Sequence, residues 1–121
     1  MVSLRVRFRL WIEVDGRYLI GKGGAELLRA IRECGSMAAA ARKLGMPYRI
    51  AWERLRRMEQ ALGAPLVETR RGGPRGGGSR LTPLGELLLS LYEEIERRVS
   101  QAVAAISLDN LESQLNSQAR R

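Results

Sequence analysis

The chain has 121 residues, 45% of them hydrophobic and 28% charged, and this composition indicates one folded domain rather than a disordered segment. It contains no histidine and a single cysteine, Cys34, which excludes His-based metal sites, His-based catalytic dyads and an intrachain disulfide. Lysine and arginine together exceed aspartate and glutamate by eight, a balance typical of proteins that bind a polyanion.

Residues 4–14 alternate strictly between apolar and other side chains, which predicts a half-buried strand. The Asp15-Gly16 pair is a hairpin turn signal, and residues 17–20 supply the returning strand. Arginines interrupt the apolar residues at the beginning of the sequence, so we expect no secretory signal there. No apolar run approaches the roughly 20 residues that span a bilayer, and we expect a cytoplasmic protein that does not enter a membrane.

Helical spacing of apolar residues replaces the two-residue period at the middle of the chain. The expected helices cover residues 25–34, 37–44 and 48–62. Gly35 and Gly45 end the first two, and Ser36 is the N-cap of the second. Small Ala40 and Ala41 let the second and third helices cross closely. A short helix, a turn with glycine and a longer helix form the layout of a helix-turn-helix motif.

A basic, glycine-rich segment follows the third helix. Its expected parts are strands over residues 65–71 and 80–82 and a loop over residues 72–79. Residues 69–85 contain four arginines and no acidic residue, so the segment predicts a wing whose tip approaches a phosphate backbone. A nucleotide-phosphate loop would require Lys-Ser or Lys-Thr after its last glycine, but Gly78 is followed directly by Ser79. A flexible solvated loop remains the alternative.

The last predicted helix covers residues 83–106, after a Thr82-Pro83 start signal. Its apolar stripe steps by four and three residues, and we expect it to hold a homodimer. The stripe comprises Leu84, Leu88, Leu91, Ile95, Val99, Ala102 and Ile106. Residues 107–121 are polar and lose this period, which indicates a frayed helix end or a disordered tail.

The positive charge and the outer face of the third helix indicate where DNA would bind. Residues 1–82 carry a net charge of +10, and residues 83–121 carry −2. The outer face has a varied, hydrogen-bonding surface at the beginning of the helix, as a recognition helix requires. Trp52 has two open interpretations, contact with bases or packing in the core. The candidate DNA-contacting residues are Ser36, Pro47, Tyr48, Arg49, Trp52, Glu53, Arg56, Arg57, Arg71, Arg75, Ser79 and Arg80.

Over residues 10–105 the sequence resembles the winged helix-turn-helix domain of the ModE molybdate-responsive regulators, which is akin to LysR-type DNA-binding domains. The pieces that carry the resemblance are Gly35-Ser36, Ala40-Ala41, Gly45-x-x-Tyr48, Ala51-Trp52, Met58-Glu59 and the glycine-rich wing ending in Leu81-Thr82. The resemblance implies dimers through the terminal helices. Full-length members carry additional oxyanion-binding domains after this one, and we expect that module to be absent here, with a separate ligand-sensing protein as a possible partner.

The sequence therefore predicts a mainly α (α+β) fold, a winged helix-turn-helix with an N-terminal β-hairpin and a long C-terminal dimerisation helix. We expect a homodimeric, sequence-specific regulator that binds double-stranded DNA. A non-specific architectural or RNA-binding basic protein is the second hypothesis, but its outer helix face would carry uniform cations. The sequence offers no catalytic constellation, metal site or cofactor motif, so no enzyme is expected.

Overall fold

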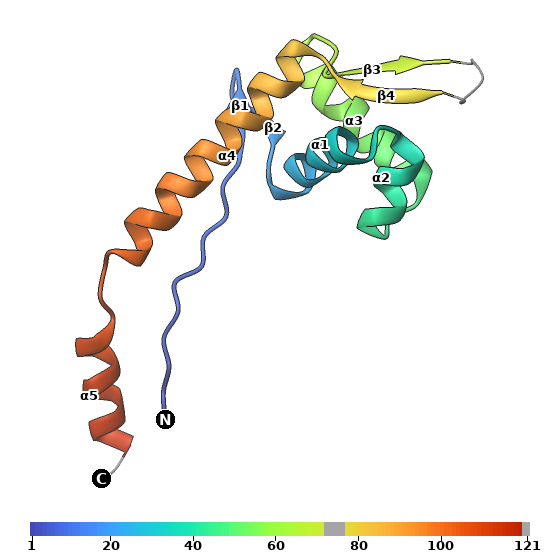
Figure 1. The fold of residues 1–121 in the computed structure, drawn as a ribbon. Helices are drawn as coiled ribbons and strands as arrows, with labels where there is room; N and C mark the ends of the chain where they lie inside the picture. Colours follow the sequence, from blue (N-terminus) through green and yellow to red (C-terminus); the bar gives the residue numbers. More distant parts are fainter. Residues whose placement is uncertain (72–76, 120–121) are drawn as a thin grey trace. The chain divides into compact units, whose positions relative to one another are not determined.

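The computed structural model describes residues 1–71 and 77–119. Figure 1 shows the order of its helices and strands along the chain. The chain divides into two units, which we describe separately: residues 9–93, called the first unit, and residues 1–8 with 94–121, called the second unit. None of the described helices combines the length and apolar character needed to cross a membrane.

The first unit begins with the hairpin of β1 (Ile12–Val14) and β2 (Arg17–Ile20). Asp15 and Gly16 both adopt positive φ, 51° and 76°, as the turn signal predicted. The predicted strand over residues 4–14 is wrong in its length, because only its last three residues are in a strand. Strand β2 has four residues before the chain turns into a helix, so no described strand is available to pair with residues 4–11.

Three helices follow: α1 (Lys22–Cys34), α2 (Met37–Leu44) and α3 (Tyr48–Leu62). The bounds of α2 and α3 are as predicted, whereas α1 begins three residues before residue 25 and includes Gly23 and Gly24. Gly35 and Gly45, with φ of 75° and 65°, end the first two helices in the left-handed region. Ser36 is the predicted N-cap, and its Oγ accepts a hydrogen bond from Ala39 N at 3.1 Å. Ala40 and Ala41 are buried, which allows the close approach expected of α2.

The core of the first unit is formed mainly by the helices. Leu27, Leu28 and Ile31 of α1 are fully buried, and Ala51, Leu55 and Met58 of α3 pack on the same cluster. The Lys43 ammonium of α2 forms a hydrogen bond and ion pair with the Glu33 carboxylate of α1. This contact lowers the pKa of Glu33 and raises that of Lys43 from their ordinary values. It also links the two helices at the surface.

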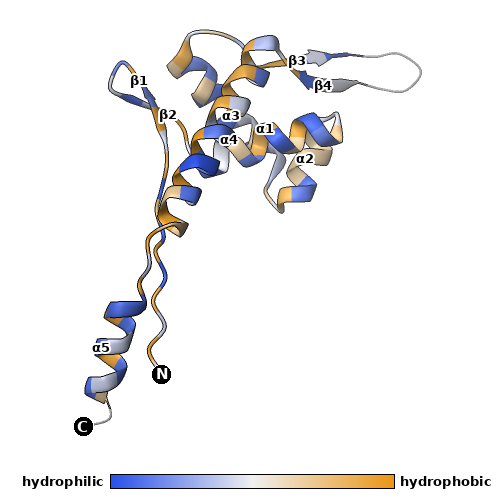
Figure 2. Cartoon of the chain, turned by 60° about the vertical axis from the view of Figure 1, so that its left-hand side comes forward, coloured by the Kyte–Doolittle hydropathy of each residue, from blue (hydrophilic) through white to orange (hydrophobic). Residues whose placement is uncertain are grey.

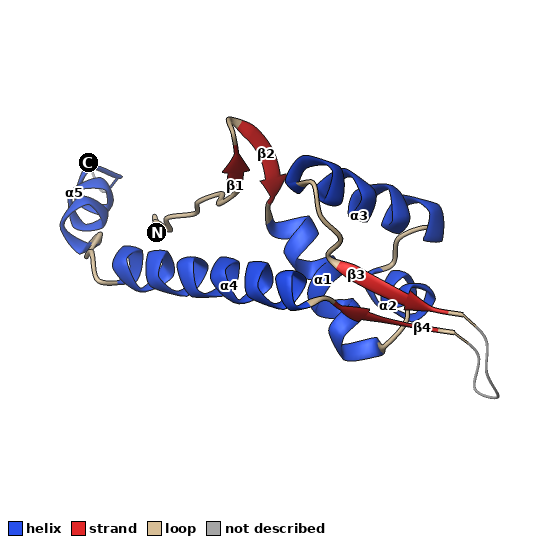
Figure 3. Ribbon diagram, turned by 90° about the horizontal axis from the view of Figure 1, so that it is seen from above, coloured by secondary structure: helices blue, strands red, loops and turns tan. Residues whose placement is uncertain are grey.

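The predicted wing is present as an antiparallel ribbon of β3 (Val67–Arg70) and β4 (Gly78–Leu81), which extends from the helices in Figure 3. The predicted loop over residues 72–79 is wrong at its end, because Gly78 and Ser79 pair with Arg70 and Thr69 as part of β4. Both strands are anchored. The Glu59 carboxylate of α3 accepts a hydrogen bond from Leu66 N at 2.8 Å, just before β3. In β4, Ser79 N donates to Gly35 O at 2.8 Å, which holds the ribbon against the turn between α1 and α2.

Helix α4 (Pro83–Ala104) starts in the first unit and ends in the second. Its Thr82 cap is confirmed, because Gly85 N donates to Thr82 Oγ1 at 3.0 Å. Figure 2 shows polar and apolar residues alternating along this helix. The predicted dimerisation stripe is wrong at Leu88, which is buried in the core of its own unit with Leu89 and Tyr92. The reason is that α4 has one buried apolar side and one exposed apolar side, and a spacing of three and four residues assigned residues of both sides to one stripe.

The second unit contains a helix where the sequence predicted a frayed or disordered tail. This helix, α5 (Asp109–Ala119), is preceded by Ser107, whose Oγ accepts a hydrogen bond from Asp109 N at 3.2 Å. Its polar side chains bind the beginning of the chain: Val2 N donates to Asn116 Oδ1 at 2.7 Å, and Leu4 N to Glu112 Oε2 at 2.6 Å. None of the described residues of this unit is buried.

A test of the packing between the wing and α4 uses Gly85. A Cβ at this position would overlap the carbonyl oxygen of Leu66, a backbone atom that cannot swing away. Gly85→Ala is therefore expected to lower the free energy of unfolding by about 1–3 kcal/mol, although alanine favours a helix by about 1 kcal/mol. Urea denaturation followed by circular dichroism measures the change. In the control Gly23→Ala, the new Cβ meets only the end of the Arg54 side chain, so stability should hold or rise.

Candidate nucleic-acid interface

The outer face of α3 begins at the first helical residue and is well exposed. Tyr48 is 54% exposed, and the Arg49 side chain is 79% exposed. The opposite side carries Ala51, Leu55 and Met58, which are buried in the core. Packing of the buried side therefore fixes the helix, and its exposed side could enter the major groove of DNA, which is wide enough to admit an α-helix.

Side chains on successive turns of this face contact one another. The rings of Tyr48 and Trp52 lie edge to face, with centroids 6.2 Å apart and an interplanar angle of 84°. The Arg56 guanidinium carbon lies 5.4 Å from the centroid of the Trp52 ring, in cation–π contact. Trp52 is half-buried and packs at the edge of the core, which fixes its ring. The rest of the ring contacts Tyr48 and Arg56.

Arg49 and Glu53 form an ion pair across one turn of α3, with 2.8 Å between Nη1 and Oε1. The pair is exposed, so it contributes little to stability. It does restrict the Arg49 guanidinium to the outer face of the helix. A carboxylate and a guanidinium at adjacent positions present both hydrogen-bond acceptors and donors, which is a more varied surface than a row of cations.

A groove of about 510 Å³ lies between this face, the start of α2 and the wing, and we call it the wing groove. Among the described residues that line it are three arginines and no aspartate or glutamate. It brings together six of the predicted contact residues. These are Ser36, Tyr48, Trp52, Arg56, Arg71 and Ser79.

The other predicted residues lie outside the wing groove. Arg57 lines a separate depression beside Tyr18 and Gly23, next to the β2–α1 turn. Pro47, Arg49 and Glu53 are exposed but do not line the groove, and Arg75 lies outside the described residues. Arg56 and Arg57, both predicted contact residues, therefore line different depressions.

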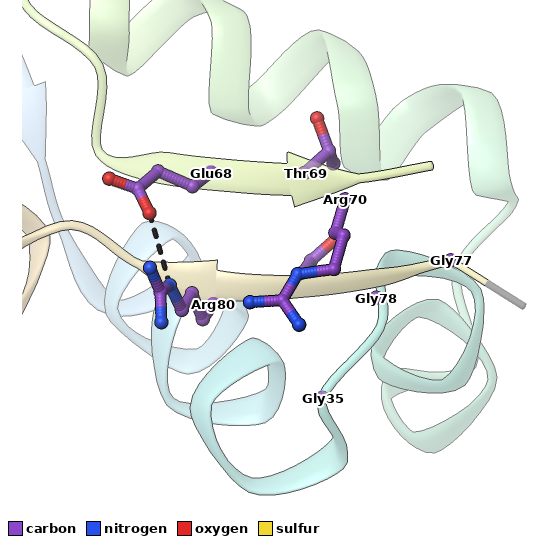
Figure 4. A pocket seen from close by; sticks show the side chains of 8 residues that line it. Gly35, Glu68, Thr69, Arg70, Gly77, Gly78 and Arg80 are labelled. Atoms are coloured by element: carbon purple, nitrogen blue, oxygen red, sulfur yellow. Dashed lines mark hydrogen bonds and ion pairs between the residues drawn. The ribbon is translucent and has the colours of Figure 1, made fainter. Parts of the chain in front are cut away.

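Arg80 lies on the other face of the wing, over a second hollow of about 530 Å³ (Figure 4). Its guanidinium pairs with Glu68 across the two strands at 3.0 Å, so its charge is partly compensated. Arg70 extends over the same hollow. Arg70 and Thr69 also line the wing groove but were not among the predicted contact residues. Thr69 could have been inferred from the sequence, because it pairs with Ser79 across the two strands and lies on the same face of the ribbon.

Comparison with protein families gives a match to bacterial regulatory helix-turn-helix proteins of the lysR family over residues 24–86. The matched segment covers nearly all of α1, the complete α2, α3 and wing, and the start of α4. It therefore contains every element that borders the wing groove.

Several similar proteins have names that refer to molybdenum or to transcription. The molybdenum-pterin-binding protein MopB of Rhodobacter capsulatus is 44% identical over 85 residues, which are 68% of this chain and 32% of that protein. The transcriptional regulator ModE of Haemophilus influenzae is 37% identical over 93 residues, 77% of this chain and 36% of that protein. The chain thus spans about a third of the length of these curated relatives.

Solved structures show the same fold. ArgP from Mycobacterium tuberculosis has a TM-score of 0.53 and 30% identity, covering 69% of this chain and 30% of that one. The DNA-binding domain of CbnR in complex with DNA has a TM-score of 0.53 and 23% identity, covering 82% of this chain and 97% of that one. At that identity the second likeness concerns the fold alone.

Proposed function

The chain belongs to the LysR-type family of bacterial regulatory helix-turn-helix proteins and carries a ModE-type DNA-binding domain, and from this premise we propose that it is a homodimeric, sequence-specific transcriptional regulator. The observation that supports this most directly is the wing groove, which borders the varied outer face of α3 and has no acidic residue among its described lining residues. The chain is a binding module and not an enzyme, as its ModE relatives are named transcriptional regulators.

In the proposed complex, α3 enters the major groove and the wing follows the adjacent backbone or minor groove. Arg49 is the candidate for reading a guanine, because a guanidinium donates two parallel hydrogen bonds to guanine O6 and N7. Arg56 and Arg71, which line the wing groove, are candidates for phosphate contacts. Phosphate contacts position the protein on any sequence, whereas contacts to base edges select one.

A non-specific architectural role is the second candidate, and the formal net charge of +8 favours it. Charge alone explains affinity for any duplex. It does not explain why a glutamate, Glu53, lies on the outer face of α3 and pairs with Arg49. We therefore place sequence-specific recognition first.

The homodimer is proposed from the apolar surface of α4. Leu84, Leu87 and Leu91 lie on its exposed side, and Leu87 and Leu91 are 65% and 47% exposed. Ile95 continues the same side one turn further. A second copy of the chain is the occupant that would cover this surface symmetrically, as a two-fold operator requires. The names of several relatives refer to molybdenum, and we propose that any molybdenum-dependent signal reaches this domain from another segment or a separate protein.

The first test of recognition is Arg49→Ala. Loss of the guanidinium should remove discrimination at one base pair, about 1–3 kcal/mol, with little change in affinity for random DNA. Selection from a random duplex pool followed by titration of single-base variants measures it. The matched control is Arg98→Ala, which breaks an Arg–Glu pair of the same 2.8 Å length on α4. Equal losses on specific and random DNA would contradict the placement of the recognition face.

Arg71→Ala tests the role of the wing. Since a phosphate contact carries no sequence information, this change should weaken binding to all duplexes alike and reduce the slope of log K against log salt by roughly one unit. Titrations at several salt concentrations measure the slope. Arg97→Ala removes the same charge from an exposed position on α4. An equal reduction in that control would attribute the effect to net charge instead of the wing.

The combined change Leu91→Glu and Ile95→Glu tests the dimer. Two carboxylates on the proposed contact surface should give monomers at micromolar concentration and weaken binding to a two-fold operator. Sedimentation velocity measures the assembly. Ser90→Glu, at an exposed position beside Leu91, adds charge outside that surface and should leave the dimer intact. A wild-type chain that sediments as a monomer would contradict the proposal.

A further inference from the structure

Ser79 has a buried side chain with an unused hydroxyl group. The residue is only 9% exposed and lines the wing groove. Its hydroxyl makes no hydrogen bond to the part of the chain that the structure describes, yet its oxygen is not sealed from solvent. Because this oxygen can still be reached from solvent and no described residue engages it, the hydroxyl can donate a hydrogen bond to whatever occupies the groove.

The beginning of α2 lies beside this hydroxyl and also presents unused donors. Ser36 Oγ satisfies only Ala39 N, and the amides of Met37 and Ala38 have no acceptor among the described residues. Both residues line the wing groove with Ser79. The hydrogen bond from Ser79 N to Gly35 O holds β4 directly over this helix start, so the position of the hydroxyl is fixed relative to the amides.

The charges around the groove favour an anion. Arg56 is held against the Trp52 ring and pairs with no carboxylate in the described portion of the chain. Arg71 lines the same groove, and no acidic side chain does. Two amides, a hydroxyl and a guanidinium provide the donors that the oxygens of a tetrahedral anion accept.

We propose that Ser79 Oγ, the amides of Met37 and Ala38 and the Arg56 guanidinium together bind one phosphodiester of the DNA backbone, on the strand that passes from α3 to the wing. This inference rests on the DNA-binding part of the proposed function and not on sequence specificity. It assigns a direct contact with DNA to Ser79, a buried wing residue. A flexible, exposed arginine attracts any nearby phosphate, whereas a buried hydroxyl contacts one phosphate at a defined position.

The test combines a protein variant with a chemical change in the DNA. Duplexes carry one neutral methylphosphonate in place of a phosphate, placed at each position of the selected site in turn. At one position per half-site the wild type should bind about tenfold more weakly, and Ser79→Ala should bind unmodified DNA about tenfold more weakly. In Ser79→Ala, the methylphosphonate at that position should cost much less than in the wild type, because the two changes remove the same contact.

Two further variants and one anion complete the design. Ser79→Cys keeps the side-chain volume with a poor donor and should behave like Ser79→Ala, while Ser90→Ala on α4 should bind as the wild type does. Thermal denaturation shows that each variant is folded. Inorganic phosphate at constant ionic strength should compete only weakly, whereas saturable binding that excludes duplex would assign the site to the free anion and overturn the proposal.

The outcomes separate this proposal from the function on which it rests. The phosphate site would be overturned if Ser79→Ala bound DNA as the wild type does. It would also be overturned if the methylphosphonate at every position weakened binding of Ser79→Ala as much as binding of the wild type. Specific recognition would stand in both cases. If the wild type binds all duplexes alike, sequence specificity fails. The tenfold loss in Ser79→Ala on an arbitrary duplex would then still support the phosphate site, and no loss would overturn it.

Discussion

The arrangement of the interface depends on one backbone hydrogen bond, from Ser79 N to Gly35 O. Gly35 ends α1 with a left-handed φ of 75°, and the same residue accepts the bond that fixes β4. Gly78 permits the approach, since a Cβ there would lie 3.2 Å from that oxygen. At the other strand, Glu59 of α3 binds the amides that precede β3. The wing is therefore tied to both sides of the helix-turn-helix, and its distance from α3 is set before any DNA arrives.

Charge is distributed so that cations outside the wing groove are compensated more often than those that line it. Arg29 pairs with Glu93 at 2.8 Å, and Arg80 pairs with Glu68. Arg56 and Arg71 line the groove and have no carboxylate partner among the described residues. Because exposed ion pairs add little stability, the pairs outside the groove do little to hold the fold. The unpaired guanidinium groups of Arg56 and Arg71 leave positive charge at the groove, which attracts a phosphate backbone.

Local signals made the helix-turn-helix predictable, while non-local pairing made other parts unpredictable. The Ser36 cap and the glycine at each helix end act within a few residues, and all were found where the sequence placed them. The length of β1 depends on a partner strand, and alternation over residues 4–14 does not reveal how long that partner is. Likewise α5 has only a short apolar pattern, with Leu111 and Leu115 both exposed, and its carboxylate and amide groups bind backbone amides of the N-terminal segment far away in the sequence.

Helix α4 has apolar residues on two sides, one buried in the first unit and the other exposed. Leu89 and Tyr92 are buried, and the Tyr92 hydroxyl donates to Leu10 O at 3.2 Å, so this side belongs to the core of the first unit. Leu87 and Leu91 emerge on the exposed side. A sequence stripe cannot separate the two sides, because leucines at both fit a spacing of three and four residues. The second unit has no fully buried side chain among its described residues. In the proposed dimer, a second copy would cover the exposed side of α4 that carries Leu87 and Leu91.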